Sequence, residues 1–261
     1  MLGAIIGDIV GSRFEFNNTK DFNFKLFTEE CDFTDDTICT VAVADAILNG
    51  KDYKDAMLEW CKKYPYERYG RAFELWMHAP NPQPYYSFGN GSAMRASAIG
   101  WLFNSKEKVL EQAKKSAEIT HNHPEGIKGA QAVALAVYLG RKGILKDVIL
   151  TEMSQFYPIF VTPLLGRNQF DATCQGILPI CLGIIRQSNS FEEAIRYAVA
   201  VGGDSDTIGA IVGAIAEAIW GIPEHIKTTA FRFLPDDIMN IYGQFYQTLN
   251  GKKRSKRKAA S

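Results

Sequence analysis

Helical periodicity constrains the fold of this chain more than any other feature of its sequence. Apolar residues recur at the three- and four-residue spacing of a single helix face in the stripes 127–138, 191–199 and 208–219. Further helices are expected over residues 35–49, 53–64, 67–78, 93–103, 106–119, 145–156, 173–187 and 236–249. The alternating apolar stretch Phe22, Phe24 and Leu26 is long enough for a short extended piece but too short for a sheet. The sequence therefore predicts an all-α helical bundle.

The length and composition favour one large domain. The chain has 261 residues, of which 46% are hydrophobic, enough to bury a sizeable core. The Pro-rich segment 79–84 breaks the helical pattern, but the pattern is alike on both sides, so it is expected to be an internal loop. We assign residues 1–250 to the helical domain. Residues 251–261 carry a basic run after the last apolar stripe and are predicted to be a disordered tail.

The charge and cysteine content indicate a cytoplasmic protein without a membrane partner. Lysine plus arginine equals aspartate plus glutamate at 29 each, so no global field attracts nucleic acid or an anionic membrane. A contact of the basic tail with nucleic acid or phosphate remains as an alternative. The apolar residues 1–11 have no basic leader and are interrupted by Asp8. Five cysteines without ligand spacing indicate free thiols in a reducing compartment.

Two acidic helix starts stand out as candidate metal ligands. Thr34-Asp35-Asp36-Thr37 and Asp204-Ser205-Asp206-Thr207 each open an apolar run, and either alone would make a good helix N-cap. A cap needs only one acceptor, whereas each motif has two carboxylates that repel each other unless a cation offsets them. If the motifs face each other, their oxygens suit Mg²⁺ or Mn²⁺ and not Zn²⁺, and two ions fit the charge. The predicted ligands are Thr34, Asp35, Asp36, Asp204, Asp206 and Thr207.

Several other polar positions accompany these motifs. Gly202-Gly203 allows a tight backbone entry before the second motif. The Gly89–Ser92 turn could offer backbone N–H groups to a phosphate, although a turn that caps a helix is the common structural interpretation. Asp8 is expected to be a buried carboxylate bonded to backbone. Glu15 lies beyond the apolar run, where it can swing toward a site, and His121 lies at a break between helices.

Several motifs occur together in the order found in one known family. They are GAIIGDIVGSRFE, TDDT, GNGSAMR, ITH and VGGDSDTIGAIVGAIAEAIWG. The chain therefore resembles the ADP-ribosylglycohydrolases, the family that includes dinitrogenase reductase activating glycohydrolase. The resemblance implies a single-domain orthogonal helical bundle with a binuclear Mg²⁺ or Mn²⁺ cleft, and it assigns the metal contacts to the same six residues. It further implies ADP-ribose contacts from Asn90, Gly91, Ser92 and His121, and a mobile acid that aligns best with Glu15.

Two departures from the family pattern matter. The usual GGDTDT is GGDSDT here, which keeps the hydroxyl and should spare the chemistry. The chain is also shorter than many relatives, and residues 170–187 match only loosely. This second departure leaves the adenosine pocket and the acceptor undefined.

The expected function is removal of ADP-ribose from a modified protein side chain or a small ADP-riboside. Cleavage would occur at the distal ribose, with Asp36 or Asp204 positioning or deprotonating the water and Glu15 assisting the leaving group. One alternative is a non-catalytic ADP-ribose or metal sensor or scaffold. Another is a metal-dependent nucleotide phosphohydrolase. The sequence leaves open the linkage cleaved and the choice between Mg²⁺ and Mn²⁺.

Overall fold

The computed structural model describes residues 1–160 and 170–259, with side chains up to residue 251. The fold is all-α, as predicted, and within these ranges the only β-type pairing is an isolated bridge between Gly89 and Thr173. The α-helices are α1 (Leu2–Gly11), α2 (Asp35–Asn49), α3 (Tyr53–Lys63), α4 (Arg71–His78), α5 (Gly91–Met94), α6 (Ser97–Leu102), α7 (Lys106–Glu118), α8 (Pro124–Arg141), α9 (Lys146–Met153), α10 (Cys174–Gln187), α11 (Phe191–Ala200), α12 (Ser205–Trp220), α13 (Glu224–Ala230) and α14 (Asp236–Ala259), and two 3-10 turns cover Ser12–Phe14 and Phe231–Phe233.

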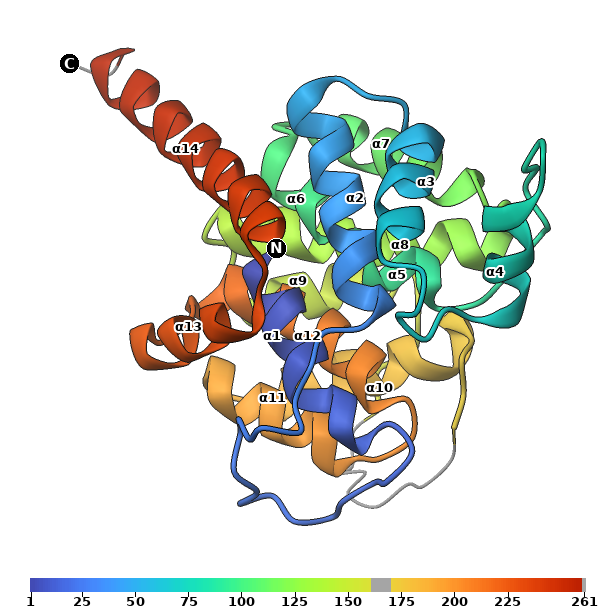
Figure 1. Cartoon of the computed structure of the whole chain (residues 1–261). Helices are drawn as coiled ribbons and strands as arrows, with labels where there is room; N and C mark the ends of the chain where they lie inside the picture. Colours follow the sequence, from blue (N-terminus) through green and yellow to red (C-terminus); the bar gives the residue numbers. More distant parts are fainter. Residues whose placement is uncertain (161–169, 260–261) are drawn as a thin grey trace.

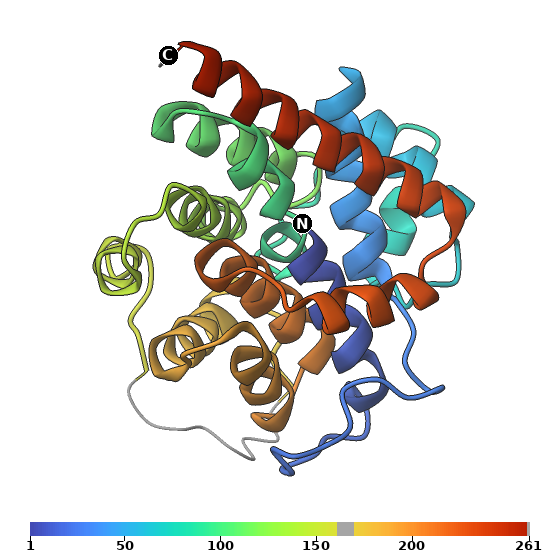
Figure 2. The same ribbon diagram turned by 90° about the vertical axis from the view of Figure 1, so that its left-hand side faces the viewer.

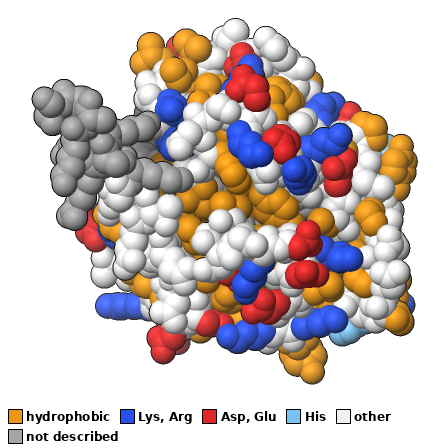
Figure 3. Space-filling view, turned by 90° about the horizontal axis from the view of Figure 1, so that it is seen from above, with side chains coloured by type: hydrophobic (Ala, Val, Ile, Leu, Met, Phe, Trp, Pro, Cys, Tyr) orange, Lys and Arg blue, Asp and Glu red, His pale blue; other side chains and the backbone are white. Residues whose placement is uncertain are grey.

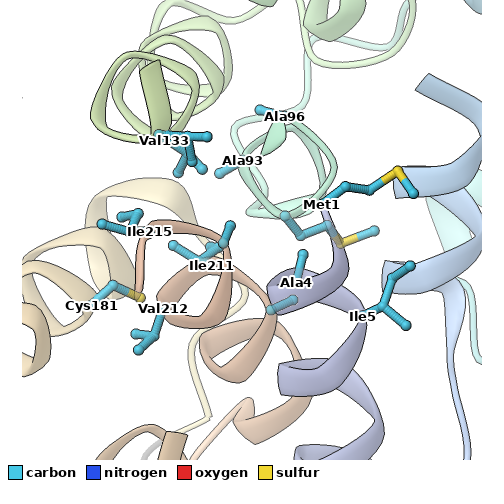
Figure 4. Packing of buried hydrophobic residues seen from close by; sticks show 14 of the residues in the cluster. Met1, Ala4, Ile5, Ala93, Ala96, Val133, Cys181, Ile211, Val212 and Ile215 are labelled. Carbon is cyan, nitrogen blue, oxygen red and sulfur yellow. The ribbon is translucent and has the colours of Figure 1, made fainter. Parts of the chain in front are cut away.

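Helices α1 and α12 form the centre of the bundle, and the other helices surround them (Figures 1 and 2). α12 contacts α8, α10 and α11 besides α1, while α7 packs on α8 and α3 on α2. Figure 4 shows where the layers meet: Ala4 of α1 lies toward Ile211 of α12, Val133 of α8 lies opposite Ile211 and Ile215, and Ile5 of α1 points away from α12. These side chains are buried, so the central pair is held by apolar packing on every side.

Glycines allow α1 and α12 to approach with their backbones almost in contact. A Cβ at Gly7 would lie 1.9 Å from the carbonyl oxygen of Gly209, so only glycine fits there. Gly3 lies against Gly213, and Gly11 against Ser205, which makes the two helices antiparallel. This pairing fixes the first turn of α12 beside the last turn of α1.

Several helix boundaries differ from those predicted. α2 spans the predicted residues 35–49, but α4 begins only at Arg71, because Arg68 has a left-handed backbone with φ 53°. The helix predicted over residues 93–103 is broken in two. It stops after Met94 because the Arg95 side chain turns inward, is fully buried, and donates to Ser116 O and Thr120 Oγ1.

The segment from Phe22 to Leu26 does not form the short extended piece that was expected: Phe22 and Asn23 lie in a turn, in which the Asn23 backbone N–H donates to Asp21 Oδ1, and a bend follows at Leu26. Its carbonyl groups at Phe22 and Phe24 accept hydrogen bonds from Arg196 of α11, and Phe24 is buried. α1 and α13 had not been expected as helices. The segment 161–169 lies outside the described residues.

The last helix, α14, continues to Ala259 and extends away from the other helices in Figure 1. It buries Ile238, Ile241 and Phe245 against the body. The backbone of residues 251–259 is thus helical here, and disorder of this tail in solution stays a prediction.

The surface carries mixed charge. Figure 3 shows acidic and basic side chains interspersed over one face, with apolar side chains between them, in keeping with 29 residues of each sign. Among the described residues, no helix is long and apolar enough to cross a membrane.

Candidate active site

Asp8 of α1 anchors the first acidic motif. Its carboxylate accepts hydrogen bonds from the backbone N–H and the hydroxyl of both Thr34 and Thr37. Burial raises the pKa of Asp8 to about 6, against the opposing effect of these hydrogen bonds. The expectation that Asp8 is a buried carboxylate bonded to backbone is confirmed.

Thr34, and not an aspartate, caps α2. Its Oγ1 accepts from the backbone N–H of Asp36 at 3.3 Å while donating to Asp8. The carboxylates of Asp35 and Asp36 are therefore not used for capping, and Asp36 is 2% exposed. The Thr34 hydroxyl does not line the cleft described below, so its role as a metal ligand stays a prediction.

In the second motif, Asp206 Oδ1 accepts from the backbone N–H of Thr207 in the first turn of α12 at 3.0 Å, whereas Asp204 bonds elsewhere. Asp204 precedes α12 but makes no side-chain cap bond, and its Oδ2 instead accepts from Asn90 Nδ2 at 2.6 Å. Gly202 and Gly203 enter this turn with φ of 80° and 83°, as the expected tight entry requires. Asn18 exchanges two hydrogen bonds with the backbone of Gly203 and fixes the turn to the loop after α1.

The two acidic motifs meet, although they are far apart in the sequence. The hydroxyl of Thr207 donates to Asp36 Oδ2 at 3.0 Å. Carboxylate oxygens of Glu15, Asp204 and Asp206 all lie within 4.8 Å of one another. The antiparallel pairing of α1 and α12 explains this cluster, because it places the residues after Gly11 beside the start of α12.

The clustered carboxylates are electrostatically unfavourable when no cation is present. Burial, followed by the charges of Asp204 and Asp36, raises the pKa of Asp206 well above its usual value. Burial, followed by Cys39 and Asp8, does the same for Asp35. The folded chain thus gathers like charges that a protein would normally separate.

The site's residues fit a hard cation. Asp36 Oδ1 is buried and has no hydrogen-bond partner among the described residues, which is costly unless another group meets it. The surrounding donors are carboxylate and hydroxyl oxygens, the ligands that Mg²⁺ and Mn²⁺ prefer. Cys39 also lines the cleft, but a hydrogen bond with Cys61, and then burial, keep its pKa well above the usual value, so it remains a thiol.

A cleft of about 420 Å³ opens above the acids. Its lining includes the Gly89–Gly91 turn with His121, Phe170 and Ala172, and also Glu15, Phe16, Arg68 and the start of α4. Asp36, Asp204 and Asp206 lie along it with Thr207. Its volume suits a ligand of nucleotide size.

Of the four residues expected to bind substrate, three line the cleft and Ser92 does not. His121 is 5% exposed and lies against the turn: a Cβ at Gly91 would be 3.3 Å from its Nε2. Burial, and then the charge of Arg95, lowers the pKa of His121 well below its usual value, so the ring is neutral. Asn90 and Gly91 line the cleft, but Ser92 does not: it is fully buried, and its hydroxyl donates to Gly126 O. Contact of these four residues with substrate stays a prediction.

The sequence argument missed several lining residues. Cys39 follows Asp35 by four positions on α2, so helical spacing alone could have placed it beside the acids. Tyr85 and Phe73 also line the cleft. Arg68 and Arg71 had no sequence signal, because the left-handed turn that brings them to the cleft depends on tertiary contacts.

The fold and site together define an all-helical protein with an acidic cleft for a polar ligand, and known proteins share this pattern. A family model described as ADP-ribosylglycohydrolase matches residues 1–254. The ADP-ribosylhydrolase ARH3 of Homo sapiens is 24% identical over 92% of this chain and 90% of its own length. The ADP-ribosylarginine hydrolase Tri1 of Pseudomonas putida (strain GB-1) is 24% identical over 88% of this chain and 73% of its own.

A solved structure has the same fold. The structure, an ADP-ribosylglycohydrolase-related protein complex, matches with a TM-score of 0.73 and 22% identity over 95% of both chains. Because the family model spans nearly the whole sequence, this chain belongs to the ADP-ribosylglycohydrolase family. It is an enzyme, a hydrolase of glycosidic bonds.

Proposed function

We propose that the enzyme releases ADP-ribose from a modified protein side chain or a small ADP-riboside, using two Mg²⁺ or Mn²⁺ ions. The observation that carries this proposal is the meeting of the two acidic motifs through Thr207 and Asp36, beside the unpartnered Asp36 Oδ1. Both named relatives are, by name, ADP-ribosylhydrolases, which supports the donor half of the substrate.

The ions would be held by Asp35, Asp36, Asp204 and Asp206, with Thr34 and Thr207. When bound, they would supply positive charge to orient the ribose hydroxyls and to activate water. Ion number and identity are part of the proposal. The charge of the clustered acids and their oxygen-only donor set support it.

In the reaction, a water oxygen forms a bond to the anomeric carbon of the distal ribose while the bond to the acceptor breaks. Asp36 or Asp204 would position this water or remove its proton, and nearby carboxylates would stabilise the oxocarbenium-like charge. Glu15 would deliver a proton to the leaving acceptor. Its carboxylate lies beside Asp204 and Asp206 but is bound to Arg68, so it is held at the edge of the cluster.

The glycine turn and His121 would bind the rest of ADP-ribose. Thr120 Oγ1 accepts from Arg95 and can donate its own proton to His121 Nδ1 at 2.7 Å. The imidazole proton then resides on Nε2, which faces the Gly89–Gly91 turn. His121 would therefore be a neutral hydrogen-bond donor to the substrate, and not a catalytic base.

The five cysteines are all unpaired and buried, which supports placing this activity in the reducing cytoplasm. The presence of both acidic motifs favours an active enzyme over a non-catalytic sensor. The identity of the product distinguishes the two hydrolase activities: free ADP-ribose indicates a glycohydrolase, and nucleoside monophosphate indicates a phosphohydrolase.

The test is to incubate the protein with ADP-ribosylated peptides in Mg²⁺, Mn²⁺ or EDTA and to identify the product by mass spectrometry. We expect metal-dependent release of free ADP-ribose by the wild type. Asp35→Ala and Asp206→Ala should lose metal binding and turnover together. Full turnover by either variant, or release of nucleoside monophosphate in place of ADP-ribose, would contradict the proposal.

A further inference from the structure

Two arginines line the cleft together with Glu15. Arg68 Nη1 donates to Glu15 Oε2 at 3.1 Å and to the carbonyl oxygen of Ser12 at 2.9 Å. Arg71, at the start of α4, also lines the cleft. Its side chain is exposed and has no hydrogen-bond or ion-pair partner among the described residues. One guanidinium is therefore fixed at the catalytic cluster, and the second is free to meet a ligand.

The backbone at Arg68 is strained. Its φ of 53° lies in the left-handed region, which a side chain with a Cβ rarely adopts. This conformation precedes α4, whose N-cap, Gly70, also lines the cleft, so the positive end of the helix lies at the cleft. Such local strain persists only where surrounding contacts stabilise it. Here the contacts of Arg68 with Glu15 and Ser12 hold its side chain at the cleft.

Under the proposed function, on which this inference rests, different residues of the cleft meet different parts of the substrate. The nucleotide half belongs with the Gly89–Gly91 turn and His121, while Glu15 protonates the leaving acceptor. Because Arg68 is bonded to Glu15, the acceptor must depart near Arg68, and Arg71 follows it in the cleft lining at the start of α4. The cleft's other arginine among the described residues, Arg95, is fully buried and donates to Thr120 Oγ1.

The acidic residues of the cleft do not neutralise the positive charge of Arg68 and Arg71. Asp35, Asp36, Asp204 and Asp206 are assigned to the cations, and Glu15 is already paired with Arg68. Glu67 and Glu74, the acids nearest to Arg68 and Arg71 in the sequence, do not line the cleft. An acceptor that bears positive charge would thus be repelled there, and a negatively charged one attracted.

We infer that the enzyme's acceptor is an acidic peptide segment, and that Arg68 and Arg71 select it over a cationic arginine acceptor. The two residues act on the acceptor side alone, since the donor half is common to all ADP-ribosylated substrates. Because Arg71 is exposed at the rim, its contribution should be expressed mainly in KM and in salt dependence.

The test uses two serine-ADP-ribosylated peptides that differ only in flanking residues, two glutamates in one and two lysines in the other. We expect wild-type kcat/KM to favour the acidic peptide by about tenfold at low salt, and the preference to shrink in about 0.5 M salt. Arg71→Glu should abolish or invert the preference through KM. Arg68→Gly, which suits the left-handed backbone, should reduce it and also lower kcat by releasing Glu15.

Lys62→Glu is the matched control, because it makes the same charge change on an exposed α3 residue that does not line the cleft. It should leave the preference unchanged. Equal rates on both peptides, or an equal loss of preference in the Lys62 and Arg71 variants, would overturn the inference while leaving the proposed function intact. No ADP-ribose release from either peptide would overturn the inference, and it would overturn the proposed function as well only if ADP-ribosylarginine peptides also gave no release.

Discussion

The Asp8 carboxylate holds the first turn of α2 in place through hydrogen bonds from two threonines. Its neighbours Thr34 and Thr37 supply only donors to it, two from each residue. The residue is fully buried, so no water can replace a lost acceptor. The position of Asp35 and Asp36 in the cleft therefore depends on a residue that does not itself line it.

Asp8→Asn should destabilise the protein by about 2 kcal/mol, because an amide NH₂ would face donors in a buried site. The free energy of unfolding, measured in urea, checks this value. Asp52→Asn is the control: Asp52 is an exposed N-cap of α3, and asparagine caps equally well, so its change should stay within about 0.5 kcal/mol. Equal stability of Asp8→Asn and wild type would show that this network contributes little.

Single residues were predictable from the sequence where their chemistry is unusual. Paired carboxylates at two helix starts are hard to explain as caps, and Thr34 alone caps α2 in the structure. Arg68 could not be found this way. A lone arginine in a charged segment is usually a solvated side chain, and only the tertiary structure reveals its φ of 53° and its contact with Glu15.

At the scale of elements, α1 is the helix that sequence patterns could not identify. It is apolar on all faces and contains Gly3, Gly7 and Gly11, which disfavour an isolated helix. Its stability comes from contact with α12, where these same glycines allow the backbones to meet. Amphipathic helices such as α11, with one apolar stripe, were predicted because their own sequence shows which face is buried.

Gly7→Ala should destabilise the protein by at least ~3 kcal/mol, because its Cβ would meet the backbone of Gly209, which cannot move aside. It should also displace α12 and reduce activity. Gly243→Ala on α14 is the control, since nothing lies within 4 Å of the added Cβ, and it should stabilise by ~0.5–1 kcal/mol. Thermal melts and turnover measurements on both variants test these predictions. A wild-type melting temperature in Gly7→Ala would contradict the close packing.

The apolar packing of α14 gives a prediction for the basic tail. Ile238, Ile241 and Phe245 are buried, and the apolar stripe of the helix ends at Leu249. A chain that ends after Gly251 should therefore melt within about 1 °C of the full chain, because it keeps the whole apolar stripe. A larger loss of melting temperature would mean that the basic run stabilises the domain.

Over the whole molecule, the bundle assembles a charge cluster that its own residues do not neutralise. α1 fixes the start of α2 through Asp8 and the start of α12 through the glycine contact, so both acidic motifs converge on one cleft. The all-α class was predictable from helical periodicity, whereas this convergence was a hypothesis from charge repulsion and from the family resemblance, because it depends on which helices pack together. A cation bound at this cluster would stabilise the fold.

This arrangement predicts opposite effects of one substitution with and without metal. Asp36→Asn removes a buried charge, so in EDTA the variant should melt higher than wild type, by about 2–4 °C for each kcal/mol of repulsion relieved. In saturating Mg²⁺ or Mn²⁺ the order should reverse, because wild type gains binding energy that the variant has lost. Glu59→Gln, which alters an exposed carboxylate on α3, should change neither comparison. Equal metal-induced shifts in wild type and Asp36→Asn would show that the ions, if they bind, do not bind at this cluster.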